Sequence, residues 1–157
     1  MPHQSPNPQL RIEQITQATT EALAILEEYY EAVHVVRRDT PAALQKTLDE
    51  CGSAMWLARL NGAVAGCVVL RPLHTEPDAG ECKRLYVRPE ARGHHIANRL
   101  MDVLEDFAHA AGTRWIYLDT HDGLKAAIAL YRQRGYQPCP RYNDNPQATL
   151  FMRKNIS

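Results

Sequence analysis

Apolar and polar residues change their period several times along the chain, and each change predicts an element. Arg11–Ile15 alternates, which is typical of a strand at the edge of a sheet. Thr40 followed by Pro41 marks the start of a short helix that reaches about Cys51. Between these segments, helical spacing predicts an amphipathic helix with one apolar face. That face consists of Ala22, Ile25, Leu26, Tyr29, Val33 and Val36.

The middle of the chain predicts a hairpin. Ala54–Leu60 and Ala63–Leu70 are rich in strand formers, and Asn61-Gly62 between them strongly favours a two-residue hairpin turn. Val64–Leu70 is almost wholly apolar, so we expect its strand to be buried on both faces. A polar loop then leads into a further strand that ends near Val87.

The last third predicts two more helices alternating with strands. The helices are expected over 96–111 and 124–134, and the strands over 114–120 and 148–152. The strand that ends near Val87 and the strand over 114–120 are joined by a helix, so they should run parallel. The whole order predicts an α/β fold with a mixed sheet covered by helices on both faces.

Composition narrows the class of protein. The chain has 157 residues, which suits one domain, and its 18 basic and 18 acidic residues balance. We therefore expect neither a nucleic-acid arm nor a polybasic membrane patch. No apolar run approaches the roughly 20 residues of a membrane helix, and the N-terminus lacks the pattern of a secretory signal. Residues 1–9 read as a frayed lead-in, and a cytoplasmic location is expected.

Cysteines and histidines do not predict a metal site. The four cysteines are widely spaced and form no CxxC pair, so we interpret them as small buried residues or inert thiols. His94 and His95 are neighbours, and adjacent residues of a helix point about 100° apart. No acidic or cysteine partner stands at ligand spacing nearby. We expect the protein to use no metal.

Candidate chemistry gathers at the turn that follows the strand ending near Val87. Pro89 forces the chain to turn, and Gly93 allows a ligand to approach the backbone closely. Arg92 adds a fork of donors that suits phosphate oxygens, and the first turn of the next helix has unpaired N–H groups. The alternative is an ordinary junction with solvated side chains, and these residues alone do not decide between the two.

The stretch Arg92–Ala97 resembles the coenzyme-binding loop of the Gcn5-related N-acetyltransferases, the GNAT family. That loop has Arg or Gln, two residues, Gly, one residue, and then Gly or Ala. Arg92 and Ala97 fit this pattern, whereas His95 stands where the family has its central glycine. We expect His95 to be tolerated, because the first turn of a helix does not require positive φ. Lys83–Pro89 also resembles the family's fourth strand and its exit turn.

A second resemblance lies in Lys125–Tyr136, which is similar to a later helix of the same family. In many members a tyrosine at the position of Tyr131 lies by the coenzyme sulfur. The alternative is that Tyr131 is a core aromatic whose hydroxyl reaches the rim. The family often has an asparagine where this chain has Leu124, so one polar contact to the coenzyme is lost. The two stretches lie in the second half of the chain.

The resemblance implies a single GNAT domain over residues 1–157. Its sheet would be mixed and mostly antiparallel, with a splayed parallel pair of strands that holds the pantetheine arm of acetyl-CoA. A strand N–H, that of Leu85 or Val87, would stabilise the oxygen of the attacked carbonyl. The residues expected to bind the coenzyme are Leu85, Tyr86, Val87, Arg92, Gly93, His94, His95, Ile96, Ala97, Asn98, Lys125 and Tyr131.

The activity implied is direct transfer of acetyl from acetyl-CoA to the primary amine of a small molecule in a ternary complex. Tyr131 would protonate the leaving thiolate, since a phenol pKa lies near 10. Glu81 is the expected base, acting through water or with a raised pKa. The alternative for Glu81 is a solvated glutamate at the sheet edge. His74, His121 and Asp122 are possible substitutes, although each reads more simply as a solvated loop residue.

The acceptor is less well defined. Pro140–Pro146 could line a pocket for an amine that carries a carboxylate, held by Arg141 or Arg71. It could equally be a surface loop. A protein lysine or N-terminal acetyltransferase stays open as an alternative, as does a non-catalytic acyl-CoA sensor, which His95 and Leu124 favour. The apolar last strand would allow a homodimer.

Overall fold

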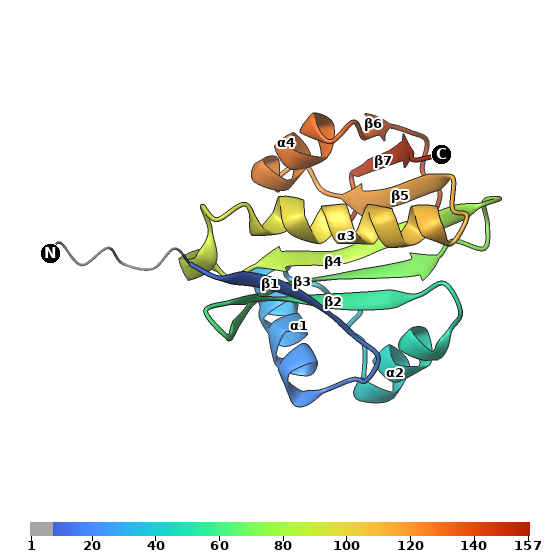
Figure 1. Ribbon diagram of the computed structural model, residues 1–157. Helices are drawn as coiled ribbons and strands as arrows, with labels where there is room; N and C mark the ends of the chain where they lie inside the picture. Colours follow the sequence, from blue (N-terminus) through green and yellow to red (C-terminus); the bar gives the residue numbers. More distant parts are fainter. Residues whose placement is uncertain (1–7) are drawn as a thin grey trace, which may run out of the picture.

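The computed structural model describes residues 8–157, so most of the predicted frayed lead-in lies outside the described residues. Figure 1 shows the order of the elements along the chain. The helices are α1 (Thr20–Val33), α2 (Pro41–Asp49), the 3-10 turn η1 (Pro89–Ala91), α3 (Ile96–Ala110) and α4 (Lys125–Gln133). The strands are β1 (Leu10–Ile15), β2 (Ala54–Leu60), β3 (Ala63–Pro72), β4 (Ala79–Val87), β5 (Trp115–Thr120), β6 (Gln137–Pro138) and β7 (Leu150–Asn155).

The strands form one mixed sheet in the order β1-β2-β3-β4-β5-β7-β6. β4 and β5 run parallel and the other neighbours are antiparallel, which confirms the predicted fold class. β1 lies at the edge, as its alternation predicted. The predicted hairpin is also confirmed, because Asn61 and Gly62 both have positive φ, at 52° and 86°, as a primed turn requires.

Two clusters of buried side chains cover the two faces of the sheet. On β2, Trp56 packs in the cluster beneath α3, whereas Met55 and Leu57 pack in the cluster formed with α1 and α2. Figure 1 shows α3 in front of the sheet and α1 on its other side. Because strand residues alternate between faces, the continuous apolar run of β3 is buried on both sides, as expected.

Two predicted elements, the first helix and the last strand, have different bounds in the structure. α1 ends at Val33, because His34 takes the left-handed conformation with φ of 55° and turns the chain away. The prediction that Val36 completes the apolar face is therefore wrong, and Val36 is 79% exposed. The last strand runs over Leu150–Asn155 rather than 148–152. Its end is polar in sequence, but Arg153 packs its guanidinium over Trp115 at 4.2 Å.

The parallel pair separates soon after it forms. β4 and β5 pair only through three residues of each strand, the last pair being Glu81 with Tyr117. Further along β4 the register against β3 shifts between Cys67 and Val69, and Arg84 has a φ of 61°. This bulge bends β4 away from its neighbour. The splayed parallel pair implied by the family resemblance is confirmed.

Gly66 of β3 lies where the bulged strand approaches closely. A Cβ atom at this position would stand 2.6 Å from the carbonyl oxygen of Tyr86. We expect Gly66→Ala to lower the free energy of unfolding by about 1–3 kcal/mol, because backbone cannot move aside as a side chain does. Urea unfolding would measure this. The control is Ala63→Val on the same strand, where the side chain is exposed and the substitution should be nearly neutral. An unchanged Gly66→Ala would contradict the packing described.

Candidate active site

A cavity of about 1130 Å³ lies in the gap between β4 and β5. Residues 82–87 of β4 form one wall and the face of α4 that contains Ala127 and Tyr131 forms another. The cavity extends from the turn before α3 to the loops 35–39 and 143–148. It brings together all the predicted coenzyme-binding residues except His94, which does not line it. Those that do are Leu85, Tyr86, Val87, Arg92, Gly93, His95, Ile96, Ala97, Asn98, Lys125 and Tyr131.

The turn before α3 uses two residues with positive φ. Gly93 has a φ of 91°, and His95, the N-cap of α3, has φ of 58° and ψ of 26°. The expectation that the position of His95 does not demand positive φ is therefore wrong. Glycine adopts this left-handed conformation without strain, whereas the Cβ atom of a histidine makes it sterically unfavourable. The side chain of His95 is exposed.

Helices α3 and α4 both begin at the cavity. Neither His95 nor Leu124, their N-cap residues, makes a capping hydrogen bond with its side chain. The first N–H groups of each helix are therefore left for another acceptor. Arg92 and Lys125 line the same cavity and add positive charge. This end of the cavity is suited to phosphate groups.

Tyr131 lies in the wall of the cavity and is 7% exposed. Its ring packs edge-on against Tyr136 at 5.8 Å, so the aromatic-core interpretation holds for the ring. Its hydroxyl donates to no described residue. Burial raises the pKa of Tyr131 well above its ordinary value, and the charges of Cys82 and Asp119 add to the effect. The raised pKa favours the protonated form of the phenol.

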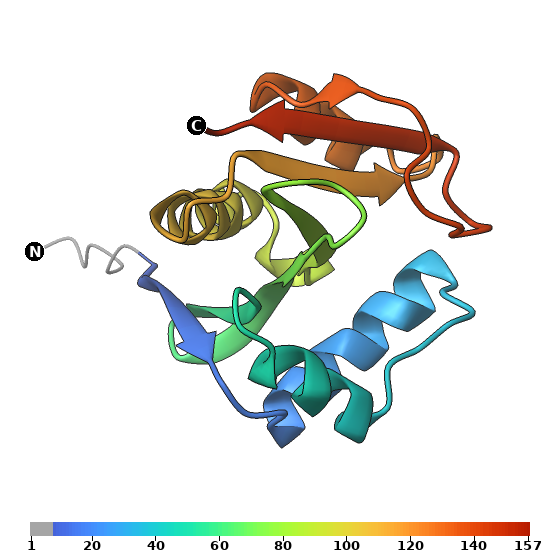
Figure 2. The same ribbon diagram turned by 90° about the vertical axis from the view of Figure 1, so that its right-hand side faces the viewer.

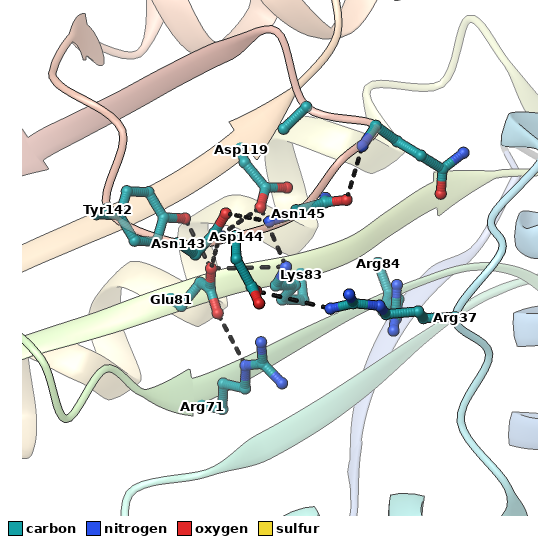
Figure 3. A network of polar contacts seen from close by, with 12 residues as sticks. Arg37, Arg71, Glu81, Lys83, Arg84, Asp119, Tyr142, Asn143, Asp144 and Asn145 are labelled. Carbon is teal, nitrogen blue, oxygen red and sulfur yellow. Dashed lines mark hydrogen bonds and ion pairs between the residues drawn. The ribbon is translucent and has the colours of Figure 1, made fainter.

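Glu81 occupies the last position of β4 that pairs with β5, and it is 1% exposed. The alternative of a solvated glutamate at the sheet edge is wrong, because β4 is an inner strand. Arg71 Nε donates to Oε1 at 2.8 Å, and Tyr142 and Asn143 donate to Oε2 at 2.7 and 3.2 Å. Figure 3 shows these donors converging from β3 and from the loop before β7. Glu81 does not line the cavity, and its role as a base stays a prediction.

Asp119 and Lys83 line the cavity beside this network, and neither was singled out from the sequence. Asn143 donates to Asp119 Oδ2 at 2.6 Å, and Lys83 Nζ lies 3.2 Å from the same oxygen. Burial alone would raise the pKa of Asp119, but Lys83 and Asn143 outweigh it and lower that pKa below its ordinary value. Asp119 thus presents a stable negative charge. Its position near the carboxyl end of a strand in the splayed pair was a usable signal.

The two arginines proposed to hold a carboxylate have different surroundings. Arg71 lines the cavity and is 45% exposed, with only its Nε engaged. Arg141 instead donates to the carbonyl oxygens of Asn143, Asn145 and Ala148 and does not line the cavity. The role proposed for Arg141 is therefore wrong, because its donors already hold the loop.

The three other residues proposed as bases have different surroundings. His74 is exposed and pairs with Glu50, and Asp122 is exposed and does not line the cavity. His121 does line the cavity, but its Nδ1 accepts a hydrogen bond from the Gly123 N–H. None of the three joins the network around Glu81.

Two loops meet over one side of the cavity. Gln147 donates from Nε2 to the carbonyl oxygen of His34 at 2.6 Å and accepts from the Val36 N–H at 3.1 Å. Arg37 and Asp144 form an exposed ion pair at 3.6 Å beside these bonds. Figure 2 shows the loop after α1 and the loop before β7 facing each other on the same side of the molecule. The loops bound the cavity at the end that contains Asp119.

Within residues 8–157 no group of three or more His, Cys, Asp or Glu side chains is placed to hold a metal ion. Among the helices described, none is both long and apolar enough to cross a membrane.

The hydrogen bond from Tyr142 to Glu81 supplies one of the donors that keep this carboxylate buried. We expect Tyr142→Phe to lower the free energy of unfolding by about 1.5–3 kcal/mol, the range for hydrogen bonds to charged groups. Tyr117→Phe is the matched control, since its ring packs against Tyr142 at 5.1 Å but its hydroxyl bonds only the exposed Arg153. Tyr117→Phe should lower the free energy of unfolding by clearly less than Tyr142→Phe does. Equal losses in urea unfolding would show that the hydrogen bond to the buried Glu81 contributes no more than the bond between Tyr117 and the exposed Arg153.

The sequence of this chain is similar to those of known acetyltransferases. Residues 19–136 match the model of the acetyltransferase (GNAT) family. An "IAA acetyltransferase" of Azospirillum brasilense is 40% identical over 103 residues, which are 64% of this chain and 66% of that protein. An uncharacterized N-acetyltransferase of Schizosaccharomyces pombe is 35% identical over 98 residues, or 62% of this chain and 60% of that protein. The chain thus spans a little under two thirds of these relatives.

Solved structures agree in fold. A GNAT-family acetyltransferase of Staphylococcus aureus superposes with a TM-score of 0.80 at 19% identity, covering 95% of this chain and all of that one. An N-acetyltransferase of Thermoplasma acidophilum, solved in complex with coenzyme A, gives a TM-score of 0.75 at 13% identity, with 94% and 99% covered. Because the family model matches residues 19–136, which is most of the sequence, the chain belongs to the acetyltransferase (GNAT) family.

Proposed function

We propose that the protein transfers an acetyl group from acetyl-CoA directly to the primary amine of a small molecule. One observation carries this proposal. A single cavity joins two uncapped helix N-termini, a protonated Tyr131 and a polar end that contains Asp119. Donor and acceptor can therefore occupy the two ends and meet beside the phenol.

The cavity suits the shape and charge of the coenzyme. In our proposal, the diphosphate is bound by the N–H groups at the start of α3, with Arg92 and Lys125 nearby. The gap between β4 and β5 takes the pantetheine arm, and the small side chains of Ala126 and Ala127 leave room along α4. The Thermoplasma acidophilum protein of the same fold was solved in complex with coenzyme A, which supports the proposal that this chain binds the coenzyme.

Charge development in the reaction has matching groups in the wall. After Glu81, β4 no longer pairs with β5, so N–H groups of β4 that face the gap are free of a strand partner. We propose that the N–H of Leu85 or Val87 stabilises the carbonyl oxygen as it becomes negative. Tyr131 donates to the sulfur as the thiolate leaves. Because its pKa is raised, a strong hydrogen bond contributes more than complete proton transfer.

The amine must lose a proton before it attacks. Glu81 stays our candidate for the base, but all of its contacts are to donors and it lies behind Asn143 and Lys83. It would accept a proton only through water or through this network. Asp119 faces the cavity directly, and its low pKa makes it better suited to attract the ammonium than to keep the proton. The structure thus supports a division of roles between two neighbouring carboxylates.

The bridge made by Gln147 supports a small acceptor over a protein. It joins the loops after α1 and before β7 across the acceptor end of the cavity. An extended peptide would need to displace both hydrogen bonds, whereas a small amine fits beneath them.

The activity is tested by incubating the protein with acetyl-CoA and a mixed library of small amines and following free thiol. We expect turnover with small amines, and Tyr131→Phe should lower kcat at saturating acetyl-CoA by about 10²-fold, the usual contribution of a positioned acid. Tyr136→Phe is the control, because that hydroxyl bonds Glu105 away from the cavity. Full turnover by Tyr131→Phe would remove the assigned role. Stabilisation by acetyl-CoA without turnover on any amine or peptide would favour a sensor.

His95 offers a separate test of the coenzyme site. We expect His95→Gly to change the Kd for acetyl-CoA by less than tenfold, or 1.4 kcal/mol. The reason is that the backbone of residue 95 already has the left-handed conformation that glycine would take. Isothermal titration measures the Kd, with His94→Gly as control, since His94 does not line the cavity. A larger gain for His95→Gly would show that the imidazole obstructs the diphosphate.

A further inference from the structure

We propose that the acceptor is zwitterionic, a small primary amine that also carries a carboxylate, with the carboxylate bound by Arg71 and the ammonium drawn to Asp119. The proposal rests on the acetyl transfer argued above and names its substrate class. It is carried by two side chains that line the same cavity with opposite charge and are held in place by shared partners.

Arg71 presents its guanidinium edge to the cavity. Nε is fixed by Glu81 at 2.8 Å, and among the described residues neither Nη atom has a hydrogen bond or ion pair. Glu81 is fully buried and is itself held by Tyr142 and Asn143, so Arg71 is anchored from behind. An anchored guanidinium with its outer edge free binds a carboxylate through two parallel hydrogen bonds, at little cost in side-chain entropy.

The neighbouring cations are already engaged. Lys83 lies between Asp119 and Glu81, at 3.2 and 3.6 Å. Arg84 bonds Asp39 at 3.4 Å and packs over the ring of Tyr30 at 5.1 Å. Both are largely buried, whereas Arg71 is not. Arg71 differs from both in combining an Nε anchored on Glu81 with a side chain that is 45% exposed. Figure 3 shows it on the side of Glu81 away from Tyr142 and Asn143.

Asp119 supplies the complementary charge near the site of transfer. Asp119 and Tyr131 line the same cavity. An ammonium attracted to Asp119 is thus held in the cavity that also contains the group assigned to the leaving sulfur. Arg71 and Asp119 are linked through Glu81 and Asn143, so the two recognition points keep a fixed separation.

The acceptor end carries charges of both signs. Its cations are Arg37, Arg38, Arg71, Lys83 and Arg84, and its anions are Asp39, Glu81, Asp119 and Asp144. A site with separated charges of both signs favours a ligand of the same kind. A polyamine offers no anion to Arg71 and would leave its second ammonium unpaired in a partly desolvated cavity, which is unfavourable.

The experiment compares amines that differ only in the carboxylate. Initial rates are measured by free thiol release at saturating acetyl-CoA for three pairs: phenylalanine and phenethylamine, alanine and ethylamine, and lysine and cadaverine. Phosphoethanolamine and a lysine-containing peptide are included as further acceptors. We expect kcat/KM to be at least tenfold higher for the carboxylate-bearing member of the best pair. Arg71→Gln should reduce that ratio about tenfold, through KM for the acceptor rather than for acetyl-CoA.

Two further variants serve as controls for Arg71→Gln. Arg71→Lys retains the charge and loses the fork, so it should restore only part of the preference. Arg11→Gln removes an exposed arginine on β1 and should leave the ratio unchanged. Unchanged acetyl-CoA binding by each variant shows that the fold is intact.

The proposal is overturned if the decarboxylated amine is used as well as its partner in every pair. It is also overturned if phosphoethanolamine or the peptide is preferred, or if Arg71→Gln leaves the ratio unaltered while acetylation continues. Absence of turnover with every acceptor, together with no binding of acetyl-CoA, refutes the proposed function itself, so the two failures are distinguishable.

Discussion

The limited pairing of β4 with β5 is the constraint on which the rest of the structure depends. Three residues of each strand are paired, and then the strands separate. Broken ladders are costly, because strand N–H and C=O groups left without partners must find others. The bulge at Arg84 and the helix crossover through α3 hold the strands apart, and the gap becomes the cavity. A ligand in the cavity can accept hydrogen bonds from the N–H groups of β4 that β5 leaves unpaired.

The buried network around Glu81 stands at the point where the ladder stops. A carboxylate that is 1% exposed is strongly unfavourable unless donors surround it, and here Arg71, Tyr142, Asn143 and Lys83 do so. These donors come from β3, β4 and the loop before β7. The network therefore joins the loop to the sheet and fixes the acceptor end of the cavity. Burial of the Glu81 carboxylate lowers stability, but it gives this end of the cavity a defined geometry.

The sequence predicted those parts that local rules determine. Asn61-Gly62 specified a hairpin, Thr40 and Pro41 a helix start, and the apolar run of β3 a central strand. The family resemblance also pointed to the turn before α3, whose residues line the cavity, while their binding of the coenzyme stays a prediction. What could not be predicted depends on distant contacts. Asp119 and Lys83 are 36 residues apart, and only the sheet brings them together. Arg141 looked available for a ligand because sequence does not show that loop carbonyls already occupy its donors.

His95 shows how local strain and function meet. A left-handed conformation costs a non-glycine residue about 1 kcal/mol or more, and surrounding structure must impose it. Here η1 and α3 fix the chain on either side, so residue 95 has no freedom to relax. The left-handed turn leads directly into residues 96–98 at the start of α3, which line the cavity. The backbone of this turn therefore matters more than the identity of its side chain, which explains why a histidine can stand where the family has glycine.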